Sequence, residues 1–427
     1  MKVIVVVSVV SFFFLASCSP RLHFQQELEK MEDDFQDHTG FILYDPATKK
    51  TLLEFNQEKY FTPASNTKIL TFFSGLQLLG DSIPAFRYLH RGDSLICWGT
   101  GDPSFLYSAV FQNERTYNFL KNTTANLYFS SSNFHTRHFG LGWAWDDYND
   151  AYSPERSPFP IYGNVVDFKS EGEDLLVSPP YFQQTTTGLG KSVEAGSVQR
   201  SPWANEFTYR GMLDTLRQQV PFRTSAELIA VLLSDTLKRE VRLVDYPMPP
   251  QTAVFYSLPA DSLYAPMMQE SDNFIAEQLL LMCAGIVSDS LDTSIAIDYV
   301  KKKFLFDLPD QPIWVDGSGL SRYNLFTPRS IVRLWEKIMA LVPRERLFQL
   351  LATGGKTGTI RNNYKAETPY IFGKTGTLSN NHCLSGYLVS KKGKILIFSF
   401  MNSNYTVPAK QVREAMEKVL RTAYERY

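Results

Sequence analysis

The sequence predicts an α/β protein of the α+β type, in which helices flank an antiparallel sheet and a β-rich domain is inserted into the chain. Helical composition at 24–37 and 409–427 encloses short apolar runs separated by polar turns, as in hairpins. From 89 to 264 the composition and pattern change: this stretch has many aromatic residues, Ser/Thr/Pro turns and short runs in which apolar and polar residues alternate. We therefore expect one domain built from 18–88 and 265–427, with 89–264 as the insertion.

The first part of this divided domain predicts a hairpin followed by a buried helix. Apolar runs at 41–45 and 51–56 stand on either side of a polar turn, which favours two paired strands. A polar start near Ser65 then leads into an apolar-rich stretch that closes at Gly80, as expected of a buried helix.

The C-terminal part predicts two further helices and three strands before the final helix. Helical periodicity covers 271–286 and 328–342. Apolar runs at 370–379, 382–390 and 394–403 predict consecutive strands joined by short turns. Consecutive hairpins of this kind build an antiparallel sheet.

The composition is that of a globular protein without bias toward a charged partner. Of the 427 residues, 44% are hydrophobic and 20% are charged, so the chain can bury a large core. The 43 basic and 44 acidic residues give a formal net charge of -1 and form no long charged block. This balance gives no electrostatic reason to expect nucleic acid as a partner.

The N-terminus predicts export. Lys2 precedes an apolar run at 3–16, which is a secretory signal too short to span a membrane comfortably, and we assign the signal to 1–17. The letters LASC at 15–18 resemble the lipobox of bacterial lipoproteins. In that case Cys18 becomes the first mature residue and carries a lipid anchor, which predicts a membrane-attached protein of the periplasm or cell envelope. The alternative is an ordinary signal peptide cut nearby, with Cys18 incidental.

The remaining cysteines and the histidines predict neither disulfides nor a metal site. Besides Cys18 there are Cys97, Cys283 and Cys383, an odd and sparse set for an exported chain of this length. The six histidines form no convincing ligand spacing.

A serine and a lysine three positions apart form the first candidate catalytic pattern. In the segment ASNTKI, Ser65 and Lys68 stand at the start of the apolar helix, on the same face. Serine becomes a nucleophile when a base takes its proton, and lysine can be that base when burial or another cation destabilises its ammonium. Taken alone, the pattern also fits a capping serine beside a surface lysine.

Two more patterns carry side chains suited to the same chemistry. Ser271 and Asn273 stand at the head of the second buried helix, although such residues are also ordinary helix caps. Lys-Thr-Gly occurs twice, at 356–358 and 374–376. Its lysine supplies positive charge, its hydroxyl a hydrogen bond to an anionic substrate, and its glycine room for close backbone approach.

Together and in this order, the patterns resemble the Ser-Xaa-Xaa-Lys, Ser-Xaa-Asn and Lys-Thr-Gly set of penicillin-binding proteins and serine β-lactamases. Ser65 and Ser271 lie 206 positions apart, which implies a domain inserted between the first two motifs. Segments at 99–105, 142–160 and 316–324 resemble the low-molecular-mass class C penicillin-binding proteins, the D-alanyl-D-alanine carboxypeptidase/endopeptidase family. The resemblance covers nearly the whole mature chain and implies a β-lactamase/transpeptidase-like fold.

The resemblance implies a serine peptidase that acts on peptidoglycan stem peptides, needs no metal or organic cofactor, and is acylated by β-lactam antibiotics. In that mechanism Ser65 attacks the carbonyl of the penultimate D-alanine and Lys68 accepts its proton. Ser271 then relays a proton to the leaving amine, and Asn273 hydrogen-bonds the substrate and helps to hold Lys68. The strand lysine would bind the terminal carboxylate and keep Lys68 deprotonated by repulsion.

Of the two Lys-Thr-Gly copies, the second is the better candidate. Its strand runs into a turn and returns as another strand, whereas the first copy follows a helix and runs into a polar segment without a partner strand. The first copy also falls where the family carries a Gly-Xaa-Xaa-Gly-Thr-Leu-Arg-like turn. We therefore assign substrate binding to Lys374, Thr375, Gly376 and Thr377.

Two other segments are assigned from their position. Asp316 and Ser318 belong to a Gly/Ser loop close to the C-terminal motifs, and we expect them to bind substrate. The Trp-rich stretch at 142–160 fits the core of the insertion better than a platform for sugars.

Three alternatives stay open. A β-lactamase or esterase on the same fold would be expected to be more compact and, for class A, to carry a separate deacylating carboxylate. A penicillin-sensing or wall-binding lipoprotein without turnover would be expected to have an eroded motif, and here all three are intact. Trimming of terminal D-alanine and cleavage of cross-bridges both use a D-Ala-D-Xaa bond, so the sequence does not separate carboxypeptidase from endopeptidase.

Overall fold

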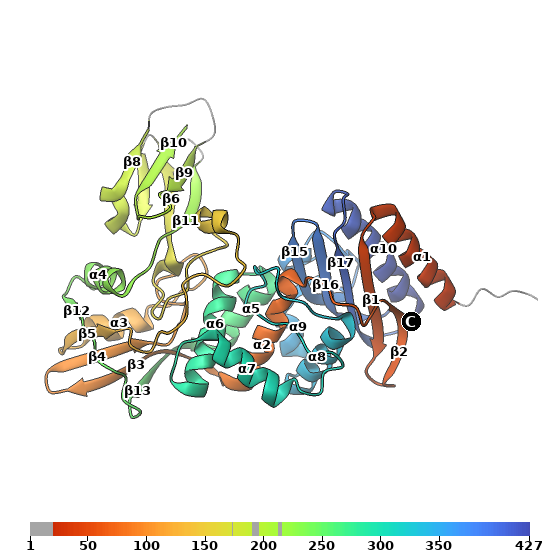
Figure 1. Ribbon diagram of the computed structural model, residues 1–427, viewed down its shortest axis with the longest axis horizontal. Helices are drawn as coiled ribbons and strands as arrows, with labels where there is room; N and C mark the ends of the chain where they lie inside the picture. The colour runs from red at the N-terminus through yellow and green to blue at the C-terminus, as the bar shows by residue number, and fades with distance from the viewer. Residues whose placement is uncertain (1–19, 173, 190–195, 212–215) are drawn as a thin grey trace, which may run out of the picture.

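The structure, a computed structural model, describes residues 20–172, 174–189, 196–211 and 216–427. The molecule is elongated, with a large sheet at one end, a layer of helices in the middle and the insertion at the other end (Figure 1). The predicted signal at 1–17 and the predicted lipidation site Cys18 lie outside the described residues.

The large sheet has six strands, each antiparallel to its neighbours. In spatial order they are β14 (Ala352–Thr353), β15 (Ile371–Leu378), β16 (Asn381–Val389), β17 (Ile395–Ser403), β1 (His38–Asp45) and β2 (Lys50–Phe55). The predicted hairpin and the predicted run of three C-terminal strands are both present. Pairing of β1 with β17 joins the two ends of the chain in one sheet.

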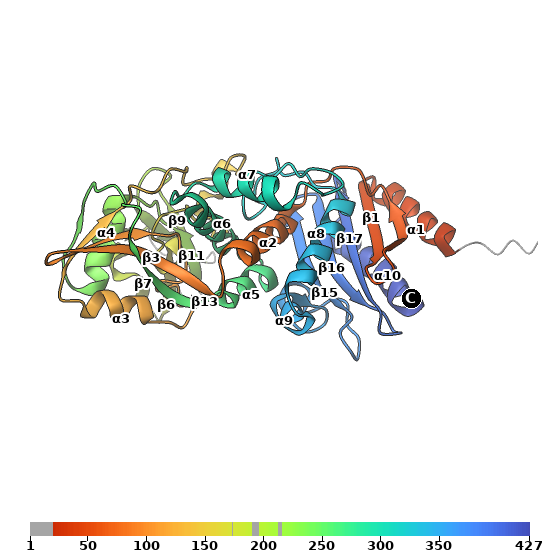
Figure 2. The same cartoon turned by 90° about the horizontal axis from the view of Figure 1, so that it is seen from below.

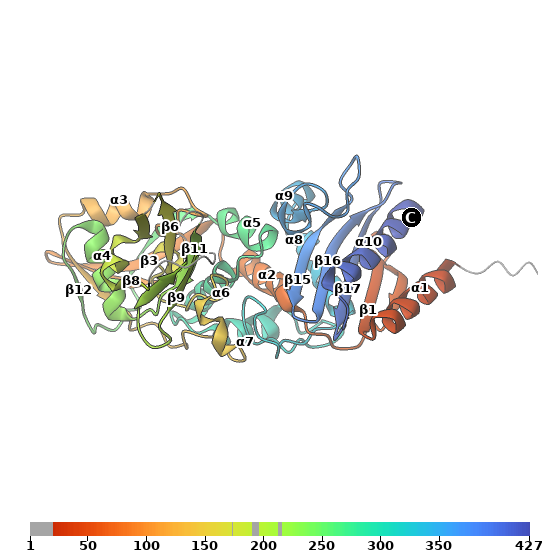
Figure 3. The same cartoon turned by 90° about the horizontal axis from the view of Figure 1, so that it is seen from above.

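Helices cover both faces of this sheet, as predicted (Figures 2 and 3). Phe41 and Leu43 belong to the core on one face, whereas Ile42 between them belongs to the core on the other, because side chains alternate along a strand. The first face carries α1 (Pro20–Phe35) and α10 (Ala409–Arg426). The second carries α2 (Lys68–Leu78), α5 (Asp261–Gln269), α6 (Asn273–Ser288), α7 (Thr293–Phe304), α8 (Pro328–Leu341) and α9 (Arg344–Leu350).

In the residues of the insertion that the structure describes, there are three small sheets and two helices. Its five-stranded sheet has the order β12 (Val241–Leu243), β5 (Asn126–Ser130), β4 (Ser94–Gly99), β3 (Ser82–Arg91) and β13 (Ala253–Pro259). Two three-stranded sheets follow the orders β8 (Thr186–Gly188), β10 (Phe207–Arg210), β9 (Ser197–Arg200) and β11 (Arg217–Pro221), β6 (Val165–Glu171), β7 (Asp174–Ser178). In the five-stranded sheet, α3 (Arg115–Asn122) lies between the parallel strands β4 and β5, and α4 (Ala226–Leu237) lies between the parallel strands β5 and β12, as parallel connections require.

The chain leaves the first domain and returns to it along two neighbouring strands. The antiparallel pair β3 and β13 joins Ser82 to Pro259 at its inner end. The insertion limits expected from the sequence, residues 89 and 264, fall inside β3 and α5. The change in composition that suggested the first limit begins only after β3 has started.

The described part of the chain also has five short 3-10 turns: η1 (Ala64–Thr67), η2 (Trp145–Asn149), η3 (Tyr162–Asn164), η4 (Pro180–Thr185) and η5 (Gly358–Ile360). The turn η1 runs directly into α2, so the helix predicted to start near Ser65 begins with a tighter turn.

Within the described ranges, no helix is long and apolar enough to cross a bilayer. Over the same residues, no three His, Cys, Asp or Glu side chains gather as metal ligands would. Cys97, Cys283 and Cys383 are buried and unpaired.

Candidate active site

Ser65 and Lys68 meet at the junction of η1 and α2. The Lys68 Nζ donates a hydrogen bond of 2.9 Å to the Ser65 Oγ. It also donates to the Asn273 Oδ1 at 2.6 Å and to the backbone carbonyl of Ser318 at 2.7 Å. Burial disfavours the ammonium form of Lys68, and the uncharged amine can keep its bonds to Asn273 and Ser318 while its lone pair accepts from the Ser65 hydroxyl.

The start of α6 brings Ser271 and Asn273 to the same place. The cap of this helix is Asp272, whose side chain accepts from the backbone N–H of Ile275 at 2.9 Å. Ser271, in the left-handed backbone region at φ 67°, and Asn273 are thus free of the capping role that the sequence left open. The Asn273 side chain bridges Lys68 and the backbone carbonyl of Tyr152, to which its Nδ2 donates at 2.9 Å.

The second Lys-Thr-Gly copy lies on β15, opposite the start of α6. The Lys374 Nζ donates to the Ser271 Oγ and to the Thr375 carbonyl, each at 2.8 Å. Thr377 is exposed at the cleft, and its Oγ1 shares a hydrogen bond of 2.8 Å with the His382 Nδ1. Hydrogen bonds thus join Ser65, Lys68 and Asn273 in one group and Ser271 and Lys374 in a second, and Ser65, Asn273 and Thr377 line the cleft.

Gly376 lets β15 pass directly against the turn that carries Ser65. A Cβ at this position would stand 2.4 Å from the Pro63 carbonyl oxygen and 2.9 Å from the Ser65 backbone nitrogen. Asn66, which the sequence reasoning missed, ties the same two elements together, because its Nδ2 donates to the Lys374 carbonyl at 3.0 Å. The signal for Asn66 was its position inside the Ser-Xaa-Xaa-Lys motif.

The first Lys-Thr-Gly copy lies in the loop between β14 and β15. Lys356 is exposed, and Gly355 and Gly358 have positive φ values of 71° and 66°, as in a tight turn. The loop contacts the second copy through Thr359, whose hydroxyl shares a hydrogen bond of 2.6 Å with the Thr375 hydroxyl.

Asp316 and Ser318 do not face the cleft, in contrast to the substrate-binding role that the sequence suggested. Both side chains are buried. The Asp316 carboxylate accepts from the backbone N–H groups of Gly319 at 2.9 Å and Ser321 at 2.8 Å, and from the side chains of Asn324 at 2.8 Å and Trp143 at 3.0 Å. These four hydrogen bonds to Asp316 hold the loop in its conformation, and the loop places the Ser318 carbonyl beside the Lys68 amine.

Burial sets the proton affinity of both lysines. It lowers the pKa of Lys68 to about 8, against the opposing charges of Asp316 and Glu277. The pKa of Lys374 lies well below its ordinary value, first because of burial and second because of the positive charge on Lys68. The sequence suggested that Lys374 keeps Lys68 deprotonated by repulsion, whereas the structure gives burial as the cause that lowers the pKa of Lys68 and places the repulsion on Lys374.

The cleft beside Ser65 has a volume of about 920 Å³. The sequence missed part of its wall: Tyr152 and Asp147 come from the Trp-rich stretch that was assigned to the core of the insertion, and Arg322 comes from the Asp316 loop. The remaining lining includes Thr377–Asn380 and Tyr405–Ala409. The sequence signal that could have placed this stretch at the cleft is the group of polar residues, such as Asp147, between its tryptophans and tyrosines.

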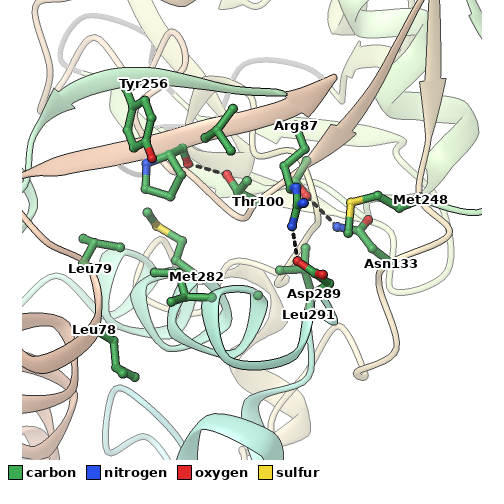
Figure 4. A pocket seen from close by; sticks show the side chains of 15 residues that line it. Leu78, Leu79, Arg87, Thr100, Asn133, Met248, Tyr256, Met282, Asp289 and Leu291 are labelled. Atoms are coloured by element: carbon green, nitrogen blue, oxygen red, sulfur yellow. Dashed lines mark hydrogen bonds and ion pairs between the residues drawn. The ribbon is translucent and has the colours of Figure 1, made fainter. Parts of the chain in front are cut away.

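A second, smaller pocket of about 250 Å³ lies between the insertion and the far ends of α2 and α6 (Figure 4). Leu79 and Met282 line it from the helices, and Arg87 on β3 forms an ion pair there with Asp289. None of the motif residues lines this pocket, so it is separate from the candidate active site.

Comparison with known proteins gives the family. The model of the D-Ala-D-Ala carboxypeptidase 3 (S13) family matches residues 24–423. D-alanyl-D-alanine carboxypeptidase DacB of Haemophilus influenzae is 23% identical over 430 residues, which cover 86% of this chain and 86% of that protein.

Solved structures share the fold. Penicillin binding protein 4 (dacB) from Haemophilus influenzae matches with a TM-score of 0.72 at 21% identity, covering 94% of this chain and 98% of that one. Bd3459, a predatory peptidoglycan endopeptidase from Bdellovibrio bacteriovorus, matches with a TM-score of 0.53 at 13% identity, covering 90% and 93%. The chain therefore belongs to the D-Ala-D-Ala carboxypeptidase 3 (S13) family and is a serine-type hydrolase of that class.

Proposed function

We propose that this protein removes the terminal D-alanine of peptidoglycan stem peptides through an acyl-enzyme on Ser65. The observation that carries the proposal is the buried amine of Lys68, 2.9 Å from the Ser65 Oγ and without an anionic hydrogen-bond partner. A neutral lysine in this position takes the serine proton while the Oγ attacks the carbonyl of the penultimate D-alanine.

The oxyanion that forms on that carbonyl needs hydrogen-bond donors. The close approach of β15 to the Ser65 turn at Gly376 supports a pair of backbone N–H groups, from Ser65 and Thr377, as those donors. A donor of this kind contributes about 3–4 kcal/mol in comparable hydrolases.

Lys374 and Ser271 act on the leaving side of the scissile bond. The substrate carboxylate binds beside Lys374, and its negative charge raises the low pKa of this lysine and favours the ammonium form. The Ser271 hydroxyl, 2.8 Å from the Lys374 Nζ, gives its proton to the leaving amine of D-alanine as the C–N bond breaks, and it takes in return the proton that Lys68 accepted from Ser65. Water then attacks the ester while Lys68 accepts a proton from it. As the ester C–O bond breaks, this proton passes to Ser65, and the acyl group leaves as a free carboxylic acid.

Ser65→Ala tests this proposal. The variant should release no D-alanine from a pentapeptide ending in D-Ala-D-Ala and should not form a covalent adduct with a fluorescent penicillin. Ser288→Ala, at the far end of α6, is the matched control and should behave as the parent protein does. D-alanine release that persists in Ser65→Ala would mean that another group is the nucleophile.

The same site is proposed to react with β-lactams, as in the Haemophilus influenzae relative whose structure has been solved in complex with one. Turnover separates a peptidase from a β-lactamase or a penicillin sensor. A peptidase keeps the penicillin label for long periods while it hydrolyses pentapeptide repeatedly. Rapid loss of label points to a β-lactamase, and a stable label without peptide turnover points to a sensor.

Cleavage of cross-bridges is a second candidate reaction. The cleft of about 920 Å³ continues past Thr377 along Leu378–Asn380 and Tyr405–Ala409, which leaves room for a second stem on the leaving side. Digestion of purified cross-linked muropeptides, followed by mass spectrometry, should then show monomers as well as free D-alanine.

Peptidoglycan lies outside the cytoplasmic membrane, so a hydrolase of this family works in the cell envelope. We propose further that Cys18 carries a lipid anchor. Labelled palmitate should enter the exported protein and should be absent from Cys18→Ala, which should move from the membrane fraction to the soluble fraction.

A further inference from the structure

A groove rich in exposed aromatic side chains adjoins the catalytic cleft. It has a volume of about 870 Å³, and its lining includes Phe139, Leu141, Trp145, Tyr148 and Trp203. Trp145 and Trp203 are each 83% exposed. An indole buries a large apolar surface when it packs, so two indoles that face solvent in one groove are typical of a binding surface.

The neighbouring tryptophan shows that this exposure is a property of the fold. Trp143 is half-buried, donates to Asp316 at 3.0 Å and is covered by the guanidinium of Arg156, 5.2 Å from its ring centre. Two positions later, Trp145 faces the solvent. The sequence-based assignment of this stretch to the core therefore fits Trp143 and is wrong for Trp145.

The groove and the catalytic cleft share a wall. Gly142 and Ala144 line both, on either side of Trp143. Because Trp143 is bonded to the Asp316 loop, which also holds Lys68 through Ser318, the position of the groove is fixed relative to Ser65. A substrate in the cleft can thus continue over this wall into the groove.

The side of the groove that carries Trp203 is also rigid. Asn205 exchanges two hydrogen bonds with the Arg223 backbone, at 2.9 Å and 2.7 Å, and the Arg223 Nη1 donates to the Trp203 carbonyl at 2.5 Å. Arg200 is buried, donates to the carbonyls of Pro221 and Ser201, and stacks on Tyr148 at 5.0 Å. The guanidinium groups of Arg200 and Arg223 are engaged within the protein, and the exposed Arg137 adds a polar group to the rim, so the groove offers a ligand apolar faces beside polar groups.

We propose that this groove binds the glycan strand of the peptidoglycan whose stem peptide lies in the catalytic cleft. The apolar faces of N-acetylated sugar rings stack on Trp145 and Trp203, while their hydroxyl and acetamido groups bond to the polar rim. An extended peptide spans about 3.3–3.6 Å per residue, so a stem of a few residues reaches from Ser65 over the shared wall to its sugar. This inference rests on the proposed function, because it assigns the second half of the same substrate.

The first test measures binding without catalysis. The Ser65→Ala protein is titrated by calorimetry with glycan strands from which all peptides have been removed, and with dextran as the control polymer. We expect binding of the glycan alone, weakened about tenfold by Trp145→Ala and about tenfold by Trp203→Ala. Phe306→Ala removes another exposed aromatic, 71% exposed and outside the groove, and should have no effect.

The second test compares two substrates for D-alanine release: the free pentapeptide and the same peptide on its disaccharide. The parent protein should have a lower KM for the disaccharide substrate, and the two tryptophan variants should lose this preference while their kcat/KM for the free peptide stays within about twofold. Both variants should melt as the parent does, because the replaced side chains are exposed.

The outcomes separate the two proposals. Absence of D-alanine release from either substrate would contradict the proposed function, while glycan binding in the first test would still support the groove. Lack of glycan binding by Ser65→Ala, or an equal loss on both substrates in the tryptophan variants, would overturn the groove as a sugar site. Binding of dextran as tight as that of the glycan would also overturn it.

Discussion

Replacing Lys374 by methionine removes an amine from the cleft while largely conserving the volume of the side chain. The Lys374 Nζ holds the Ser271 Oγ at 2.8 Å and has its other hydrogen bond to the Thr375 carbonyl. The substitution therefore removes the proposed partner of the substrate carboxylate and leaves the Ser271 hydroxyl without the group that orients it.

The expected loss follows from these two effects. A hydrogen bond to a charged group is worth about 1.5–3 kcal/mol, which is about 10- to 150-fold in rate. A misplaced proton relay costs about a further 10²- to 10⁴-fold. Since the two effects act on one step and are not additive, we expect kcat/KM for D-alanine release to fall by about 10³-fold or more.

Stability should change in a different way. The amine is buried and its charged form is disfavoured, so a methionine in its place leaves no unpaired charge in the interior. Thermal unfolding should thus occur at or above the temperature of the parent protein. Activity that disappears together with the fold would contradict this reasoning.

Lys356→Met is the matched control, because it makes the same change in the exposed copy of the motif. It should retain D-alanine release and penicillin labelling within about twofold of the parent protein. If Lys356→Met were inactive and Lys374→Met active, the wrong copy would have been assigned to the substrate.

Three other predictions follow from the geometry around Ser65. Burial lowers the pKa of Lys68 to about 8, and only the neutral form of this lysine accepts a proton, so the acylation rate should rise about tenfold per pH unit up to about pH 8 and then level. Stopped-flow labelling with penicillin from pH 6 to 10 measures this rate. An acylation rate that falls as the pH rises would refute the prediction. Gly376→Ala should slow acylation by about 10²-fold or more, because the new Cβ would stand 2.9 Å from the Ser65 backbone nitrogen and displace the turn that carries this serine. Penicillin labelling at the parent's rate would show that the strand can shift without moving Ser65. Arg156→Met should lower the free energy of unfolding in urea by about 3–5 kcal/mol, because it leaves the buried carboxylate of Glu277 without its positively charged partner. A change below about 1 kcal/mol would show that the fold does not depend on this ion pair.

Much of the fold could be predicted because its signals are local. Each strand of the C-terminal sheet carries its own alternation, and the turn after the second Lys-Thr-Gly copy marks it as half of a hairpin, which β15 and β16 form. The start of the helix at Ser65 was readable from its polar opening. What no local signal contains is that Ser65, Ser271 and Lys374 meet, and this expectation came from resemblance alone.

The failures have physical causes of the same kind. Asp316 lies among glycines and serines, which is typical of an exposed loop, yet Asn324, Trp143 and two backbone N–H groups satisfy its carboxylate in the interior. Trp145 has the composition of a core residue and lies at the surface. In both cases burial depends on partners that are distant in sequence, so the residue type is a poor guide.

The position of β1 in the sheet has a consequence for the order in which the molecule can mature. This strand, His38–Asp45, pairs with β2 on one edge and, from His38 to Tyr44, with Ser403–Ile397 of β17 on the other, so the second edge has no partner until the last part of the chain is available. Pairings between distant segments form slowly, because a long loop must close first. Ser65 follows β2 early in the chain, whereas Lys374 lies on β15, so the catalytic motifs come together only after the C-terminal strands have docked.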